Sequence, residues 1–159
     1  MLTSLARLHH APAMHAPHVL DDLQIERIAA GLVDCSLPAT EWTHAAHFAA
    51  ALWLLRHRPG FNAAAMAPVI QRYNLACGNR NTDTSGYHET ITRASLAAAA
   101  AALAAQPHAA LPMVLDRLLA GPCGRSDWLL AHWRHETLFT PEARRHWVPP
   151  DLDRMPFPL

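Results

Sequence analysis

Lysine is absent from the 159-residue sequence, and charged residues of all kinds make up only 16% of it. Thirteen basic residues, all of them arginine, balance thirteen acidic residues, so the formal net charge is zero. Nucleic-acid-binding proteins normally concentrate positive charge on one face, and docking on an anionic membrane also needs basic clusters. We therefore expect neither a nucleic acid nor a membrane as a partner.

Cysteine is scarce, and long apolar runs are missing. Cys35, Cys77 and Cys123 lie far apart without a CxxC motif, which excludes a disulfide framework. The longest apolar run, residues 96–105, is too short to span a bilayer. The N-terminus also lacks the apolar region of a secretory signal. These absences predict reduced thiols and a cytoplasmic location.

Alanine and leucine dominate a sequence that is 51% hydrophobic and has few β-branched residues, a composition that favours helices. Apolar residues recur at helical spacing between capping residues and Pro or Gly breakers. The sequence predicts helices over residues 21–35, 40–57, 62–76, 87–105, 112–119 and 127–139, followed by a short turn over 140–145.

The predicted fold class is therefore all-α, a single-domain helical bundle of about five to six helices with an up-down core. Residues 21–148 form the bundle domain. We expect residues 1–20, which hold four histidines, to be a flexible His-rich N-terminal extension. Residues 149–159 are expected to form an extended Pro-rich tail. A homo-oligomer is compatible with this organisation.

Histidine is abundant, with twelve copies, and the motif EWTHAAH places two of them at the start of a predicted helix. His44 and His47 are three residues apart, so they project from one side of that helix. This spacing suits two ligands of one metal ion, or a base and its orienting partner. Glu41, three residues earlier, extends the same side. Surface or hydrogen-bonded core histidines are the structural alternative.

A second cluster, YHET, follows the polar segment GNRNTDTSG (residues 78–86). With a helix cap at Ser85 or Gly86, His88 falls in the first turn, and Asp83 and Glu89 become a ligand, a base or partners of a histidine. Glu89 is equally suited to closing a capping box, and Tyr87 to ordinary packing.

The predicted topology brings the two clusters together. One helix separates the two that carry them, so these two should run parallel with their N-termini at the same end of the bundle. The positive end of each helix dipole favours neutral imidazoles and an anionic ligand. The later HxxH pair, His132 and His135, is not expected to share this site.

Each candidate residue then receives a role. We predict that His44, His47 and His88 hold a divalent or redox-active transition metal, which the ligand type leaves open as zinc, iron, copper or nickel. The catalytic candidates are Glu41, Asp83 and Glu89, and the substrate-binding candidates are Thr43, Arg80, Asn81 and Tyr87.

The runs LPATEWTHAAHFAAALWLL and NTDTSGYHETIT, followed by HETLFTPEARRHWVPPDL, resemble a family of small bacterial all-helical proteins. The resemblance covers residues 22–152. It implies an all-α fold and brings no activity with it. Its motifs fall on Trp42, Thr43, His44, His47, Asn81, Tyr87, His88, Glu89 and Thr90.

Three functions fit these patterns. The first is a small metal-dependent enzyme acting on a small anionic substrate. The second is a metal-free enzyme, or a small-molecule or anion-binding protein, in which the same histidines act as acid and base groups. The third is a helical interaction module with structural histidines and an interface formed by Trp42, Trp53 and Trp128.

Overall fold

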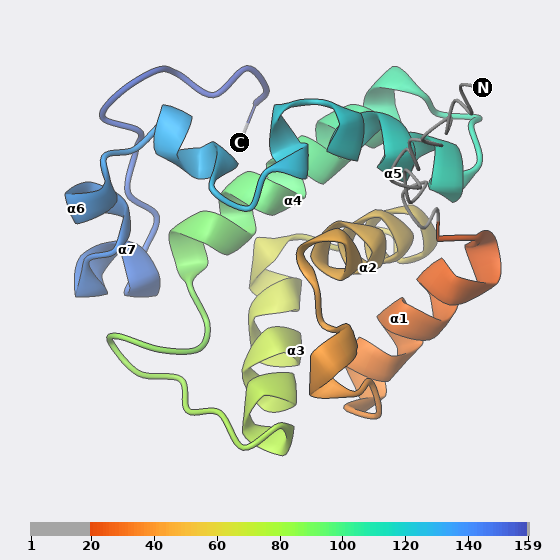
Figure 1. Ribbon diagram of the computed structural model, residues 1–159, viewed down its shortest axis with the longest axis horizontal. Coiled ribbons are helices and arrows are strands. Elements are labelled where there is room, and N and C mark those ends of the chain that lie inside the picture. Colours follow the sequence, from red (N-terminus) through yellow and green to blue (C-terminus); the bar gives the residue numbers. More distant parts are fainter. Residues whose placement is uncertain (1–19, 159) are drawn as a thin grey trace, which may run out of the picture.

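The computed structural model describes residues 20–158, which contain helices and no strand (Figure 1). The α-helices are α1 (Asp22–Asp34), α2 (His44–His57), α3 (Ala63–Ala76), α4 (Glu89–Ala105), α5 (Leu111–Ala120), α6 (His135–Leu138) and α7 (Pro141–Arg145). Three short 3₁₀ helices are η1 (Ala39–Glu41), η2 (Pro122–Gly124) and η3 (Trp128–Ala131). The prediction of an all-α bundle is confirmed. The predicted His-rich extension lies almost wholly outside the described residues.

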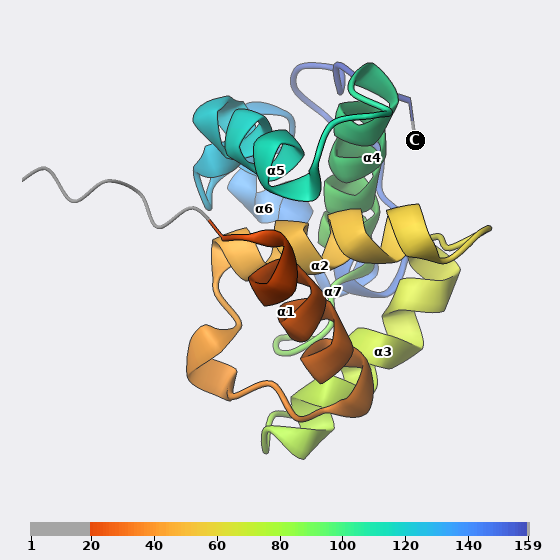
Figure 2. The ribbon, with the colours of Figure 1, turned by 90° about the vertical axis from the view of Figure 1, so that its right-hand side faces the viewer.

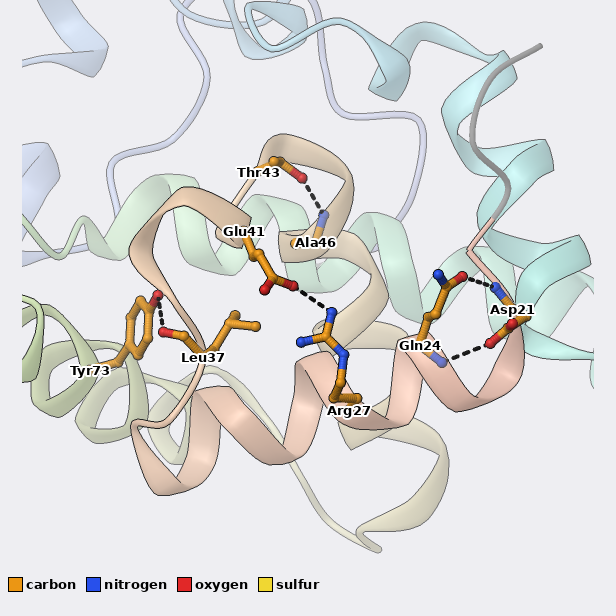
Figure 3. A network of polar contacts seen from close by, with 8 residues as sticks. All are labelled: Asp21, Gln24, Arg27, Leu37, Glu41, Thr43, Ala46 and Tyr73. Carbon is orange, nitrogen blue, oxygen red and sulfur yellow. Dashed lines mark hydrogen bonds and ion pairs between the residues drawn. The ribbon is translucent and has the colours of Figure 1, made fainter. Parts of the chain in front are cut away.

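Side-chain caps start the first three helices, and α2 begins at His44 rather than at the predicted residue 40, because residues 39–41 form η1. Asp21 and Gln24 form a reciprocal capping box on α1, with hydrogen bonds of 2.8 and 2.9 Å (Figure 3). Thr43 caps α2 through the amide of Ala46, and Asn62 caps α3. These caps satisfy amide groups that lack partners inside a helix, and so they fix the first residue of each helix.

Helix α2 occupies the centre of the described core and packs against α1, α4 and α5. Its buried face combines small alanines with Phe48, Leu52 and Leu54. Helix α4 contributes the buried alanines Ala94 and Ala99. Small side chains on both helices let the backbones approach closely, while the larger residues fill the space beside them.

The two helices that carry the histidine motifs cross each other rather than running parallel. In Figure 2, α2 runs across the view while α4 runs up it. The expectation of parallel helices is therefore corrected, although both N-terminal turns lie on the side of the molecule that faces the C-terminal segment (Figure 1).

The helix predicted over 127–139 is wrong, because the chain breaks it into η3 and α6. Residues 151 and 152, near the C-terminus, bind backbone groups that a continuous helix over 127–139 would use itself. The Asp151 carboxylate accepts a 2.9 Å hydrogen bond from the Arg134 amide, and the Leu152 amide donates to the His132 carbonyl at 3.0 Å. Both backbone groups are thereby taken from a continuous helix.

The C-terminal segment packs against the bundle along much of its length. Trp133 is fully buried and donates a 3.0 Å hydrogen bond to the Val148 carbonyl. Residues 149–158 contain no regular secondary structure, but Met155 and Phe157 pack against the core. None of the described helices is long and apolar enough to cross a membrane.

We predict that Gly86→Ala destabilises the fold more than Gly78→Ala. Both glycines have a φ of 78°, which costs an alanine about 1 kcal/mol. A Cβ at position 78 meets no atom within 4 Å, whereas one at position 86 would collide with the Arg80 carbonyl and lie 2.7 Å from Oδ1 of Asn81. Urea denaturation should show a loss of about 1 kcal/mol for Gly78→Ala and at least about 2 kcal/mol for Gly86→Ala. Equal losses of unfolding free energy in the two variants would show that a Cβ at position 86 meets no steric barrier.

Candidate functional site

A hollow of about 380 Å³ opens between the first turns of α2, the first two turns of α4 and residues 126–139 of the C-terminal segment. We call it the histidine hollow, because His44 and His47 form part of its wall. Most of its lining is apolar, and the polar side chains besides the two histidines are Ser95, Ser126 and Asp127. The apolar lining residues are Phe48, Ile91, Trp128, Leu129, Leu130, Leu138 and Phe139. A mostly apolar cavity with a few polar groups is typical of small-molecule sites.

His44 is held by a hydrogen bond across the fold. Its Nε2 lies 2.7 Å from the carbonyl oxygen of Cys123, 79 residues away, so this nitrogen carries the proton and donates. The ring also meets Phe48 edge-on at a centroid distance of 5.4 Å. The bond to the Cys123 carbonyl selects the tautomer whose unprotonated nitrogen is Nδ1.

His47 has the opposite tautomer. Its Nδ1 donates to the Thr43 carbonyl at 2.6 Å, and its ring lies 3.8 Å from the indole of Trp42 between centroids. Nε2 therefore holds a lone pair, and no group among residues 20–158 hydrogen-bonds to it. Desolvation lowers the pKa of His47, and the neighbouring His44 adds to this effect while the Thr43 carbonyl opposes it. At neutral pH the ring is an uncharged proton acceptor.

His47 is an exposed residue that lines three hollows. Besides the histidine hollow, it lines one of about 230 Å³, which we call the Arg144 hollow, and a narrow one of about 60 Å³. Trp42 and Ile70 line both of these, and His88 lines the Arg144 hollow. His47 and His88 thus share the Arg144 hollow, whereas His44 lines only the histidine hollow.

His88 uses both ring nitrogens to hold the fold. It is the N-cap of α4, where Nδ1 accepts from the Ile91 amide at 3.4 Å, and its Nε2 donates to the Leu138 carbonyl at 2.9 Å. Burial lowers the pKa of His88, and the positive charge of Arg144 lowers it further. A metal ion bound to this ring would have to displace one of these two bonds.

The predicted metal centre at His44, His47 and His88 stays a prediction. Within the part of the chain that the structure describes, no group of three or more His, Cys, Asp or Glu side chains is arranged to hold a metal ion. Among residues 20–158, Nδ1 of His44 and Nε2 of His47 have no hydrogen-bond partner, whereas both nitrogens of His88 are engaged.

The other residues of the YHET motif also make structural contacts. Tyr87 donates to the Glu89 carboxylate at 2.7 Å, and burial together with this carboxylate raises the pKa of the phenol. Thr90 is fully buried, donates to the His146 carbonyl at 2.9 Å and accepts from the Val148 amide at 3.1 Å. The motif therefore ties the start of α4 to the C-terminal segment.

Asn81 fastens the polar loop to α3. Its amide donates to the Gln71 carbonyl at 3.0 Å, and its oxygen accepts from Asn74 and from the Tyr87 amide. Asn81 was predicted to bind substrate, and here all these bonds serve to shape the loop. Thr43, predicted for the same role, caps α2 and orients His47 through its carbonyl.

The predicted acidic groups lie apart from His47. Glu41 pairs with Arg27 of α1 (Figure 3). Asp83 pairs with Arg145. A separate hollow of about 380 Å³, the polar hollow, is lined by Gln71, Asn81, Thr82, Asp83, Tyr87, Glu89, Arg144, Arg145 and Ala67. Arg80 is exposed in the loop and lines none of these four hollows.

Sequence reasoning missed several residues around His47. Ser95 lies one turn after Ile91 on α4, so helical spacing could have identified it. Trp128, Leu138 and Arg144 reach the hollows only because the C-terminal segment folds back, and no local pattern signals that placement.

Comparison with known proteins gave no family model, no curated protein and no solved structure that matches this chain.

We predict that the two bonds of His88 can be separated by substitution. Asn keeps an acceptor near the position of Nδ1, and Gln keeps a donor near that of Nε2. His88→Ala loses both the cap and the bond to Leu138, which should cost about 2–3 kcal/mol. His88→Asn and His88→Gln should each cost about half of that in chemical denaturation. A loss for His88→Ala no larger than for either isostere would show that one bond carries no stability.

The stability of the protein should fall as pH decreases below about 6.5. The folded state lowers the pKa of His47 and His88 from the ordinary value of 6.5, so the unfolded state binds more protons as acid is added. Each group can contribute a slope of up to about 1.4 kcal/mol per pH unit. Denaturation curves between pH 7.5 and 5 should show a smaller slope for His88→Gln than for the wild type. If the slope of unfolding free energy against pH is the same in His88→Gln and the wild type, His88 keeps its ordinary pKa in the folded protein. The range of about pH 7.5 to 5 covers the titration of histidine.

Proposed function

We propose that this chain is a metal-free protein that binds a small organic molecule at His47, with this imidazole as the proton or hydrogen-bond acceptor. One observation carries the proposal. The ring is fixed by the Thr43 carbonyl, its Nε2 lone pair has no partner within residues 20–158, and it lines three hollows. A backbone carbonyl on one nitrogen and a free lone pair on the other is the arrangement that a general base requires.

The surroundings support a ligand with an apolar body. Most of the histidine hollow is walled by leucine and aromatic side chains, among which Trp128 and Leu129 are buried. A volume of about 380 Å³ lies near the lower end of the range for ligand pockets, which suits a small organic molecule. Apolar contact supplies most of the affinity in such a site, and the imidazole selects a ligand that carries an O–H or N–H group.

Two probes of the same shape test the proposal. 4-Methylphenol carries a hydroxyl donor that toluene lacks, and binding of each to the EDTA-treated full chain can be followed by NMR. The hydroxyl should increase affinity about fivefold, the effect of one net hydrogen bond to the imidazole of His47. His47→Ala should reduce this ratio to about one, because the acceptor is gone.

His57→Ala is the matched control. His57 lies on the same helix and makes the same kind of bond, from Nδ1 to the Trp53 carbonyl at 2.9 Å, beside an indole at 4.5 Å. It is exposed and lines none of the hollows around His47. The proposal would be contradicted if His57→Ala also reduced the affinity ratio of 4-methylphenol to toluene to about one. Equal affinity of the wild type for both probes would contradict it as well. Binding that appears only after zinc is added would favour the metal-dependent enzyme instead.

A further inference from the structure

Arg144 is a half-buried cation that the proposed base does not use. It lies in α7 and lines both the Arg144 hollow and the polar hollow. Its Nη1 donates to the carbonyls of Gly86 and Tyr87, at 3.0 and 3.1 Å. These two bonds fix the plane of the guanidinium group while Nε and Nη2 keep their N–H groups.

No carboxylate among residues 20–158 forms an ion pair with Arg144. The two acids of the adjoining polar hollow have other partners, since Asp83 pairs with Arg145 and Glu89 accepts from Tyr87. The lining of the Arg144 hollow itself contains no Asp or Glu among the described residues. No ion pair among residues 20–158 therefore neutralises the Arg144 guanidinium, and its positive charge contributes to lowering the pKa of the adjacent His88.

The rest of the Arg144 hollow suits the remainder of an acidic ligand. Trp42, Ile70 and Ile91 form an apolar wall that continues into the narrow hollow, and Thr92 adds a hydroxyl. His47 borders the same space, so a ligand held at Arg144 would reach the proposed base. Guanidinium groups bind carboxylates through parallel, charge-assisted hydrogen bonds, which a neutral group cannot replace.

We infer that the Arg144 hollow binds the carboxylate of a small monocarboxylic acid, whose apolar part lies against Trp42, Ile70 and Ile91 beside His47. The inference rests on the proposed function, because His47 borders the Arg144 hollow as well as the histidine hollow and would accept from the same ligand. Three groups line this one cavity: the oriented guanidinium of Arg144, an apolar wall, and the imidazole of His47 with its unbonded Nε2.

The test compares benzoate with benzamide, a neutral molecule of nearly the same shape, by NMR titration of the full chain. We expect benzoate to bind about tenfold more tightly, a typical effect of one charge-assisted contact. The indole N–H signal of Trp42 should shift with both probes. Arg144→Gln should reduce benzoate affinity to that of benzamide and leave benzamide affinity unchanged.

Arg145→Gln is the control, because it removes the neighbouring charge, which pairs with Asp83 and does not line the Arg144 hollow. It should change neither affinity. If Arg144→Gln fails to fold, two other measurements test whether the charge of Arg144 binds benzoate: the Arg144→Lys variant and the effect of added salt on the wild type. The lysine variant should keep part of the preference for benzoate, and about 0.5 M NaCl should weaken benzoate but not benzamide binding to the wild type.

Several results would overturn the inference: equal affinities for the two probes in the wild type, the same loss in both arginine variants, or benzoate binding that salt leaves unchanged. If benzamide and 4-methylphenol still bind in a manner that depends on His47, only the carboxylate assignment fails. If neither of these neutral probes nor benzoate binds at all, the proposed function fails with it.

Discussion

The structure depends on the hydrogen bonds that join the first turn of α4 to the C-terminal segment. His88 caps the helix with one nitrogen and holds the Leu138 carbonyl with the other. Thr90 binds the backbone at 146 and 148, on either side of Trp147. All these groups are buried or partly buried, so each unmade bond would leave a polar atom without water. This joint places Leu138 and Phe139 as one wall of the histidine hollow.

The histidines of the two motifs differ in how many ring nitrogens bind the fold. His88 has a structural role that consumes both of its nitrogens, whereas His44 and His47 each use one nitrogen on a backbone carbonyl. An imidazole oriented in this way loses little freedom when a ligand arrives, and its tautomer is already set. Desolvation of His47 keeps that ring neutral, at some cost in stability under acidic conditions.

Much of this architecture was predictable from local sequence. The caps Asp21, Thr43 and Asn62 start α1, α2 and α3 within a few residues of the predicted positions, because capping bonds span only three residues. The split of the segment 127–139 was not predictable in this way. Asp151, which binds the Arg134 amide and interrupts that helix, lies 17 residues later in the chain.

The sequence alone determined that the chain is helical and that the motifs EWTHAAH and YHET stand at or just before the first turns of two helices, since spacing and capping are local properties. Only the tertiary structure decided which imidazole nitrogens are occupied. The carbonyls that bind His44 and His88 come from residues 79 and 50 positions away. It also decided that Arg144 faces the same hollow as His47. Such long-range contacts depend on how helices pack, and helical periodicity carries no information about them.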